Sequence, residues 1–491
     1  MTTTTDTPRP TVRTYGGWRK ARGIGLFGVG PAGTVVVLAC VVVPLMLASL
    51  DLALGALALV PGAAVAGLTI ARFDDLTLAQ TVARRLRWAW AVRRGWTAYR
   101  AQTVVERASA WDLPGVLAPT RLLSAADGRG GTFGLVWNRR TGHLTATLRC
   151  AATSTWLVDI HDADGWVANW HSWLASLGYL PMVRSVAVTV DTAPEPGTAL
   201  QDAILPRIAP DAPDDVRRLM HELVARSPAA SADVDTRVSV TFDPAAAAPR
   251  LRDLDDAVEE ISRQLTGLES SLATCGVTVL GRASADDIAG IVRTAFDPAA
   301  RGDVQRALAV HGPDGEALDW ADAGPVAADE HWDHYRHDSG VSVTWGWREA
   351  PRQHVTSGVL TRLLSPGRFP KRVTLVYRPL PAGEAARVLD AQVNAAAFRD
   401  AYRRAQRRDE SARDVADRLQ AQRAAVEEAQ GAGLVILALY VTATARQESD
   451  LPSVVSEVEA RADQSKIQLR RLVGSQSAAF ATTLPCGVPT L

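Results

Sequence analysis

Two long apolar runs dominate the first part of the chain. No charged residue occurs between Arg22 and Asp51, and none occurs between Asp51 and Arg72. Each run reaches the length of about 20 apolar residues that an α-helix needs to cross the hydrocarbon core of a bilayer. A carboxylate is costly at mid-bilayer and cheap at its edge, so Asp51 marks the expected turn. The pattern predicts a transmembrane hairpin over residues 23–72, with helices at about 24–50 and 52–71.

Basic residues flank this hairpin on both sides and are absent from its turn. They are Arg9, Arg13, Arg19, Lys20 and Arg22 before it, and Arg72, Arg84, Arg85, Arg87, Arg93, Arg94 and Arg100 after it. The positive-inside rule then predicts a multi-pass protein of the plasma membrane with both termini, including residues 1–22, in the cytoplasm. A cleaved signal peptide is disfavoured, because its apolar core spans only about 7–15 residues. A buried hairpin in a soluble protein is the other alternative.

Residues 73–110 form a basic juxtamembrane segment. From Phe73 to Glu106 the pattern keeps helical periodicity and mixes arginines with Trp88, Trp90 and Trp96. Such a helix can lie along the membrane, with arginines at lipid headgroups and indoles at the interface. It can equally pack its Trp face on the following domain. Both interpretations stay open at this point.

Beyond residue 110 the pattern of strands and helices predicts an α+β protein with mixed α/β modules. The first module, residues 111–228, contains a Trp-rich helix over Gly165–Leu177 and a strand over Val183–Val190, followed by a loop from Asp191. Its other expected elements are strands over Thr132–Asn138 and His143–Arg149, which form a hairpin, and a helix over Asp214–Ala225.

The second module, residues 229–330, follows a β-α-β-α order that suggests a ferredoxin-like unit with helices on one face. The expected elements are a strand over Thr236–Phe242, a helix over Leu251–Ala273, a strand over Val277–Leu280 and a helix over Ala285–Phe296. The stretch from Ala299 to Glu330 is rich in Ala, Asp, Gly and Pro, and we interpret it as a connector.

The C-terminal module covers residues 331–491. Its most distinctive elements are a long charged helix over Glu384–Gln430 and the continuous apolar run LVILALYVTATA at 434–445, which is typical of a strand buried on both faces. The remaining elements are strands over Val341–Trp347, Arg372–Arg378 and Ile467–Val473, and helices over Val454–Ala462 and Ser477–Thr483.

Charge and cysteine content indicate only which partners and compartments are disfavoured. The chain has 53 basic and 53 acidic residues, so no overall field favours nucleic acid. Its four cysteines are scattered and form no CxxC motif, which fits a reducing compartment.

Motifs of enzymes are missing from the sequence. There is no GxxxxGK[ST] and no GxSxG. The letters from Gly28 to Gly33 match GxGxxG, but an apolar membrane run follows, so small residues at a helix entry explain the match. We therefore expect neither an enzyme nor a cofactor, and no catalytic residue is assigned.

HWDHYRHD is the densest polar cluster. At a spacing of three residues, His331, His334 and His337 would share one face of a helix and could bind a divalent metal with Asp333 or Asp338. No separate carboxylate or cysteine motif completes a catalytic set. The favoured interpretation is a structural turn that caps the last module.

The end of the chain resembles a known family. IQLRRLVGSQSAAFATTLPCG, after the strand at 434–445 and an acidic helix, is similar to the close of the non-catalytic N-terminal domain of the VirB/TraC-type conjugation ATPases. The matching positions are Gln476, Phe480, Leu484, Pro485 and Gly487. The resemblance implies that these residues are candidates for docking a separate ATPase, because the motor domain that follows them in that family has no counterpart before Leu491.

Most of the chain also resembles a family of actinobacterial integral membrane proteins with two helices. Members accompany such an ATPase and a small PrgI-type membrane protein in conjugative, type IV-like secretion clusters. The segments Trp332–Val355 and Arg372–Pro381 carry this similarity. The two N-terminal helices with a soluble body are, more distantly, similar to EccE-type components of type VII secretion.

These resemblances imply a non-catalytic scaffold of the inner membrane that holds a motor ATPase. The expected partners are the membrane, the ATPase and the PrgI-type protein, with a homo-oligomer as a further option. The alternative is a membrane-tethered nucleic-acid-binding protein that uses the arginines of 84–107 and 399–423. Zero net charge argues against that alternative, so no direct contact with nucleic acid is expected.

Overall fold

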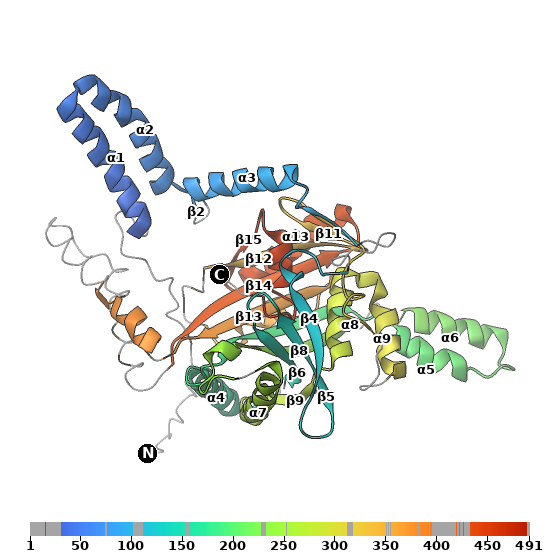
Figure 1. The fold of residues 1–491 in the computed structure, drawn as a ribbon. Helices are drawn as coiled ribbons and strands as arrows, with labels where there is room; N and C mark the ends of the chain where they lie inside the picture. The colour runs from blue at the N-terminus through green and yellow to red at the C-terminus, as the bar shows by residue number, and fades with distance from the viewer. Residues whose placement is uncertain are drawn as a thin grey trace, which may run out of the picture.

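The computed structural model describes residues 15, 31–73, 76–101, 111–152, 158–226, 232–251, 253–311, 318–349, 351, 353, 355–381, 383–391, 393–394, 419, 422, 426 and 433–488. Two apolar helices near the N-terminus project from a body of mixed α and β structure, which confirms the predicted class at that level (Figure 1).

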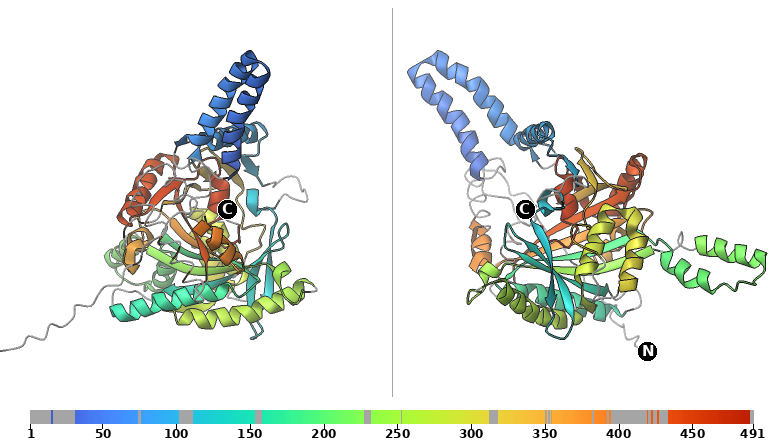
Figure 2. Two further views of the ribbon diagram at one scale, coloured as in Figure 1. Left: turned by 90° about the vertical axis from the view of Figure 1, so that its left-hand side faces the viewer. Right: turned by 45° about the vertical axis from the view of Figure 1, so that its right-hand side comes forward.

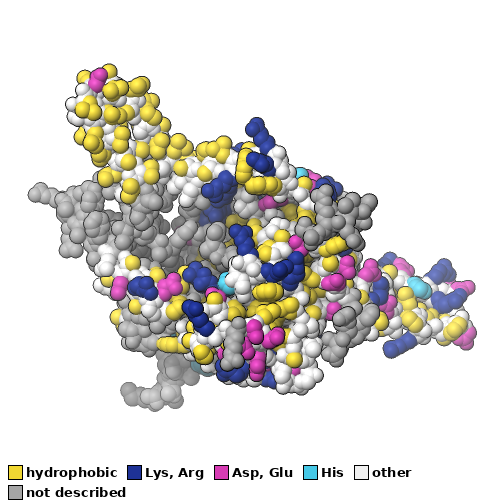
Figure 3. Space-filling model, viewed as in Figure 1, with side chains coloured by type: hydrophobic (Ala, Val, Ile, Leu, Met, Phe, Trp, Pro, Cys, Tyr) yellow, Lys and Arg dark blue, Asp and Glu magenta, His cyan; other side chains and the backbone are white. Residues whose placement is uncertain are grey.

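The hairpin has the predicted form over its described part. Helix α1 (Pro31–Leu50) and helix α2 (Leu52–Ile70) lie side by side, and both are long and apolar enough to span a membrane. Asp51 separates them and caps α2, because its Oδ1 accepts a hydrogen bond from the Ala53 amide at 2.8 Å. The surface of the hairpin is almost entirely hydrophobic (Figure 3). An apolar surface of this size exposed to water would be unfavourable, which agrees with burial in lipid.

A 13-stranded sheet organises the body, and every pairing in it is antiparallel. Its order is β3-β10-β11-β12-β14-β13-β7-β8-β6-β5-β4, with β15 paired to β12 and β9 paired to β6. The strands are β3 (Ala98–Arg100), β4 (Thr120–Ala126), β5 (Thr132–Asn138), β6 (Leu144–Ala152), β7 (Val183–Pro194), β8 (Ala232–Phe242), β9 (Val277–Arg282), β10 (Ala327–Glu330), β11 (Tyr335–His337), β12 (Gly340–Glu349), β13 (Lys371–Pro379), β14 (Val435–Ala445) and β15 (Gln468–Arg471). Strands from all three predicted modules therefore belong to one sheet.

Helices cover both faces of this sheet. On one face, α4 and α7 pack over β5 to β8, and α10 and α13 pack over β12 to β14. The other face carries α8, α14 and the segment around Leu113 and Leu117. The helices are α3 (Leu78–Arg93), α4 (Ile160–Leu177), α5 (Thr198–Ile204), α6 (Asp214–Arg226), α7 (Leu254–Ala273), α8 (Ala285–Phe296), α9 (Arg301–His311), α10 (Thr361–Leu364), α13 (Leu451–Gln464) and α14 (Gln476–Ala481).

The predicted single helical face is therefore wrong, and the reason is visible in β5. Its neighbours Leu135 and Val136 point to opposite sides, one into the core with α7 and the other into the core with α8. The β-α-β-α order itself is confirmed. Because β8 and β9 both run antiparallel to β6, they are parallel to each other, with α7 connecting them. The ferredoxin-like description of this unit stays a prediction.

Two predicted irregular stretches are ordered elements. The expected loop from Asp191 continues β7 to Pro194, because β8 and β13 supply partners for the backbone of these residues. The expected connector at 299–330 contains α9 and β10. Local composition misled the prediction here, since pairing with distant strands determines the structure at 191–194 and in β10.

The remaining predicted elements differ from the observed ones mainly in where they begin and end. The juxtamembrane helix α3 ends at Arg93, and a turn at Gly95 (φ +69°) leads into β3. Most of the predicted long helix Glu384–Gln430 lies outside the described residues. Its first part is described, and residues 383–391 are helical. The apolar strand at 434–445 is confirmed as β14, which lies between β12 and β13.

Candidate functional site

A band of buried hydroxyl groups crosses one face of the sheet. The strands that form it carry Ser or Thr at alternate positions between apolar residues, so their hydroxyls point to the same side. The hydrogen-bonded pairs are Thr145–Thr241 (3.1 Å), Thr147–Ser239 (2.9 Å), Thr189–Thr374 (3.0 Å), Thr344–Thr442 (2.9 Å) and Ser342–Thr444 (2.8 Å). We call this surface the hydroxyl face. Because its groups bond across neighbouring strands, they are satisfied although they are buried.

The C-terminal segment, residues 476–488, lies on the hydroxyl face. Gln476 accepts a hydrogen bond from the Thr344 amide at 2.8 Å and donates to the Thr344 carbonyl at 3.2 Å, so its amide pairs with the backbone of β12. Thr483 bonds Thr442 at 3.2 Å. Near its end, Gly487 (φ +60°) approaches so closely that an added Cβ would lie 2.0 Å from Thr145 Oγ1. Only glycine fits this position without displacement.

The sequence-predicted docking residues are all part of this segment. Gln476, Phe480, Leu484 and Pro485 are buried in the protein itself, and Gly487 is partly buried. Phe480 packs against Phe296, Tyr335 and His337, with ring centroids 5.0, 5.5 and 5.0 Å away. These side chains hold the segment against the sheet and are not available to a partner. Any role in docking would therefore act through the surface that the segment supports.

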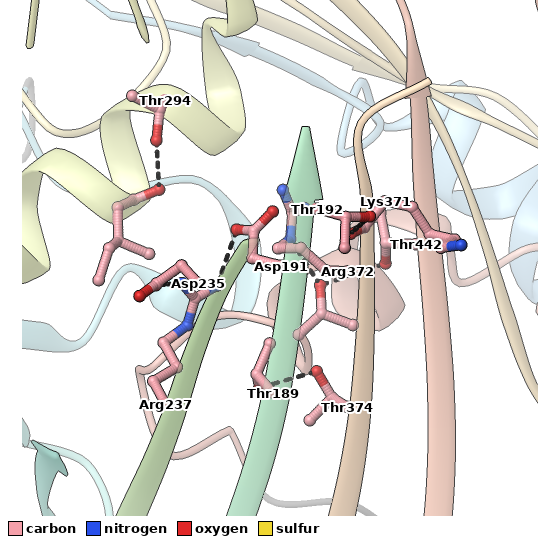
Figure 4. Close-up of polar contacts among 12 residues, drawn as sticks. Thr189, Asp191, Thr192, Asp235, Arg237, Thr294, Lys371, Arg372, Thr374 and Thr442 are labelled. Atoms are coloured by element: carbon pink, nitrogen blue, oxygen red, sulfur yellow. Dashed lines mark hydrogen bonds and ion pairs between the residues drawn. The ribbon is translucent and has the colours of Figure 1, made fainter. Parts of the chain in front are cut away.

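A buried charge cluster lies beside the segment (Figure 4). Arg237 donates to Asp191 at 3.0 Å and to Asp235 at 2.8 Å, while Arg372 donates to Thr483 at 3.2 Å. These residues come from β7, β8 and β13, where Asp191 and Arg372 are paired in register. Two carboxylates pair with Arg237 and a hydroxyl accepts from Arg372, which lowers the cost of burying both groups, although Arg237 Nε and Arg372 Nη2 have no hydrogen-bond partner among the described residues. The cluster thus fixes three strands and the C-terminal segment relative to one another.

The electrostatics of the cluster favour its charged state. Burial would raise the pKa of Asp191, but the guanidinium groups of Arg237, Arg372 and Arg301 outweigh this and hold it below its ordinary value. Burial lowers the pKa of Arg372 to about 10, with Asp191 opposing that shift. Both groups are therefore charged at neutral pH, and removing either one would leave a buried charge with less compensation.

Two buried groups of types that can act as nucleophiles, an amine and a thiol, lie in surroundings that give them a structural role. Lys371 Nζ donates to the Ser365 carbonyl at 2.9 Å, although burial lowers its pKa to about 8. Burial raises the pKa of the Cys486 thiol to about 12, which keeps it protonated and unreactive at neutral pH.

The structure does not place the three candidate metal ligands on one helical face. They belong to the segment between β10 and β11 and to β11 itself, so the helical geometry is wrong, and the interpretation as a structural turn that caps the last module stays a prediction. His331 and His334 stack with centroids 4.3 Å apart. His337 uses both ring nitrogens elsewhere: Nδ1 donates to the Phe296 carbonyl at 2.6 Å, and Nε2 bonds Ser342 at 2.8 Å. Within the described ranges, no group of three or more His, Cys, Asp or Glu residues is arranged to hold a metal.

Helix α3 presents two different faces. Trp88 packs edge-on against Trp332 with centroids 5.6 Å apart, and the Arg85 guanidinium lies 5.2 Å from the same ring. This contact agrees with packing for one face, although Trp332 belongs to the C-terminal module and not to the module that follows α3. Val82, Leu86 and Trp90 follow each other at spacings of four residues and are exposed on another. The interpretation that α3 also lies on the membrane stays a prediction, as does nucleic-acid binding by its arginines.

Sequence reasoning missed the charge cluster and the hydroxyl face. A usable signal was present, because Ser and Thr alternate with apolar residues in β6, β8, β12 and β14. Such alternation indicates a polar surface, and its burial depends on the C-terminal segment that covers it. No motif links Asp191, Arg237 and Arg372, which are far apart in the chain.

The chain was also compared with known proteins. No protein-family model matches it. No curated protein matches its sequence.

Proposed function

We propose that this protein is a non-catalytic scaffold of the inner membrane that holds the motor ATPase of a type IV-like, conjugative secretion apparatus. A type VII-like apparatus would use the same arrangement. In this proposal the hairpin spans the plasma membrane twice, both termini lie in the cytoplasm, and the sheet forms a docking body beneath the bilayer. A PrgI-type membrane protein would be a further partner.

The observation that carries the proposal is the structural role of the residues that resemble the motif of the conjugation ATPases. Gln476 binds the backbone of β12, Phe480 fills a core, and Gly487 meets the hydroxyl face. Each residue thus helps to close an α+β body, which is the role that a non-catalytic domain beside a motor requires. The exposed apolar hairpin supports a position at the membrane.

A docking surface should lie on the exposed side of the C-terminal module. Helix α13 buries Val454, Val458 and Ala462 against the sheet and exposes Ser456 and Ala460. Its outer face is therefore a suitable contact for a partner. Ending the chain before β14 would not test this, because β14 is a central strand and its loss would disrupt the sheet.

Surface substitutions allow a cleaner experiment. The full-length protein, purified from its native membranes in mild detergent, should retain the P-loop ATPase encoded in the same gene cluster. Ser456→Arg combined with Ala460→Arg should remove most of that ATPase, since two bulky charges in an interface core oppose docking. Glu259→Arg on the exposed face of α7 serves as the matched control and should retain it. If the wild-type protein recovers no such ATPase, the proposal is wrong.

A further inference from the structure

Helices α5 and α6 form an arm that projects from the side of the body (Figures 1 and 2). Val224 is the buried residue of α6, and Met220 is half-buried beside α5. The neighbouring side of α6, about a quarter-turn away, is exposed. There, Val216, Leu219 and Leu223 have exposed fractions of 47%, 54% and 54%. The arm therefore carries apolar side chains that no described part of the chain covers.

The spacing of these residues is that of a helix-pairing seam. Val216, Leu219 and Leu223 follow each other at intervals of three and four, which places them on one face of α6. Intervals of three and four are what one helix presents to another in a coiled-coil contact. Because Met220 and Val224 are the covered residues of α6, the adjoining exposed stripe is suited to a partner helix.

The charges beside the stripe indicate which partner fits. Asp215, Arg218, Glu222 and Arg226 follow one flank of the stripe, so acidic and basic groups alternate along it. Within one chain they pair as Asp215 with Arg218 and Glu222 with Arg226. Read in the opposite direction, the order is base, acid, base, acid. A second α6 running antiparallel would thus set Asp215 opposite Arg226 and Arg218 opposite Glu222.

A single register satisfies both pairs. The midpoint of 215–226 lies at 220.5 and that of 218–222 at 220, so the two nearly coincide. Val216 and Leu223 centre at 219.5, within one residue of this point, so the same register brings them nearly opposite each other and Leu219 close to its own copy. In a parallel pair about a two-fold axis, this charged flank would instead face the partner's other flank, where Met220 and Val224 lie, and its charges would find no charged partner there. The helix is therefore complementary to itself only in the antiparallel direction.

We infer that α6 is a self-association surface, through which two copies of this chain pair antiparallel about a two-fold axis. One helix buries less than the about 1,200–2,000 Å² of a stable interface between soluble proteins. Confinement of both copies to one membrane by their hairpins raises the effective concentration and offsets the small area. Since the arm extends sideways relative to the hairpin, two copies in one bilayer can bring their arms together (Figure 1). This inference does not depend on the contact with an ATPase.

Cysteine cross-linking tests the register. In the full-length protein with Cys40→Ala, Leu219→Cys lies beside the two-fold axis, whereas His221→Cys lies at the same height on the opposite side of α6. Cys150, Cys275 and Cys486 are buried and should not react. Mild oxidation in proteoliposomes should convert Leu219→Cys to a disulfide-linked dimer at least fivefold more than His221→Cys. Equal yields from the two variants would overturn the inference.

A charge exchange tests the direction. Asp215→Arg with Glu222→Arg makes the flank wholly basic, and Arg218→Glu with Arg226→Glu makes it wholly acidic. Each double variant carrying Leu219→Cys should lose most of its cross-linking alone, and mixing the two should restore it as a heterodimer. A variant that fails to fold cannot give this restoration. Cross-linking that is unchanged in each variant alone, or not restored on mixing, would contradict antiparallel pairing.

Discussion

The guanidinium carbon of Arg372 lies 4.8 Å from the centre of the Phe480 ring. Arg372 belongs to β13, in the middle of the sheet, whereas Phe480 belongs to α14 in the C-terminal segment. A buried cation over an aromatic face is attracted by the negative charge density of the ring. The contact joins the charge cluster to the apolar core beneath α14, so the segment is held by both kinds of interaction.

Phe480→Ala should therefore destabilise the body strongly. The side chain is fully buried and lies between three other rings, so its removal leaves a cavity and is expected to cost about 3–5 kcal/mol of the free energy of unfolding. Denaturant unfolding of the detergent-solubilised protein, followed by near-UV circular dichroism, measures this. Val310→Ala on α9, where the side chain is 80% exposed, is the control and should change the free energy by less than about 0.5 kcal/mol. Equal midpoints of denaturant unfolding for the two variants would contradict this role of Phe480 in holding the C-terminal segment.

Gly487→Ala tests the closest approach of the segment to the sheet. The new Cβ would overlap Thr145 Oγ1, and the left-handed backbone conformation would be strained as well. We expect a loss of more than about 1 kcal/mol in the free energy of unfolding. The matched control is Gly165→Ala in α4, which has open space around an added Cβ and should be neutral or stabilising. Limited proteolysis near the C-terminus should increase for Gly487→Ala alone.

Local sequence patterns predicted the hairpin and many individual elements, because apolar runs and periodicity act within a few residues. The β5–β6 hairpin and β14 are examples, and their positions agree closely with the prediction. The order of strands could not be predicted in this way. Asp191 in β7 pairs with Arg372 in β13, 181 residues further along the chain, and this pairing converts the expected loop at Asp191 into a strand.

The candidate site shows the same limit. A spacing of three suggested that His331, His334 and His337 share a helical face, but the strand pairing of β11 turns His337 toward Phe296 and Ser342. The residues at 476–487 were singled out by a family resemblance, but their burial could not be predicted, since it depends on hydroxyl groups from distant strands. Patterns of residue types indicated where polar surfaces lie, and only the fold shows what covers them.

His337 should make the stability of the body depend on pH. Burial lowers its pKa to about 4, helped by Arg372 and opposed by the hydrogen bond to Phe296 and by Asp297. The unfolded chain binds a proton below about pH 6.5, whereas the folded protein resists protonation until about pH 4. The free energy of unfolding should therefore fall as the pH decreases through this window, by about 3 kcal/mol in total.

His337→Asn isolates this contribution. Its amide can still donate to the Phe296 carbonyl, but it does not titrate. We expect the variant to be less stable at pH 7.5 and to have a shallower slope of unfolding free energy between about pH 6.5 and 4. His143, whose pKa burial also lowers, contributes equally to both proteins and cancels in the comparison. Identical slopes would show that His337 is not held neutral.

The exposed stripe of α3 should contact lipid if the hairpin spans the membrane. Its Val82, Leu86 and Trp90 are exposed, the helix follows α2 closely, and α3 contains no acidic residue. A helix with an apolar stripe and arginines binds best at an anionic bilayer surface. In proteoliposomes, a fluorophore on Leu86→Cys, with Cys40→Ala, should be quenched by spin-labelled lipids, more so with anionic lipid. The control Val310→Cys on α9 should not be quenched, and equal quenching at both positions would argue against a specific contact.

The predicted topology can be tested at the turn between α1 and α2. Asp51 is exposed at the tip of the hairpin, no basic residue lies near it, and the arginines flank the other ends of the two helices. The positive-inside rule therefore expects residue 51 outside the cytoplasm and the body inside. In spheroplasts of cells that express the Cys40→Ala protein, a membrane-impermeant maleimide should label Asp51→Cys. It should label Val310→Cys only after the membrane is opened. Labelling of Val310→Cys in intact spheroplasts would place the body outside, and a cytoplasmic ATPase could then not dock on it.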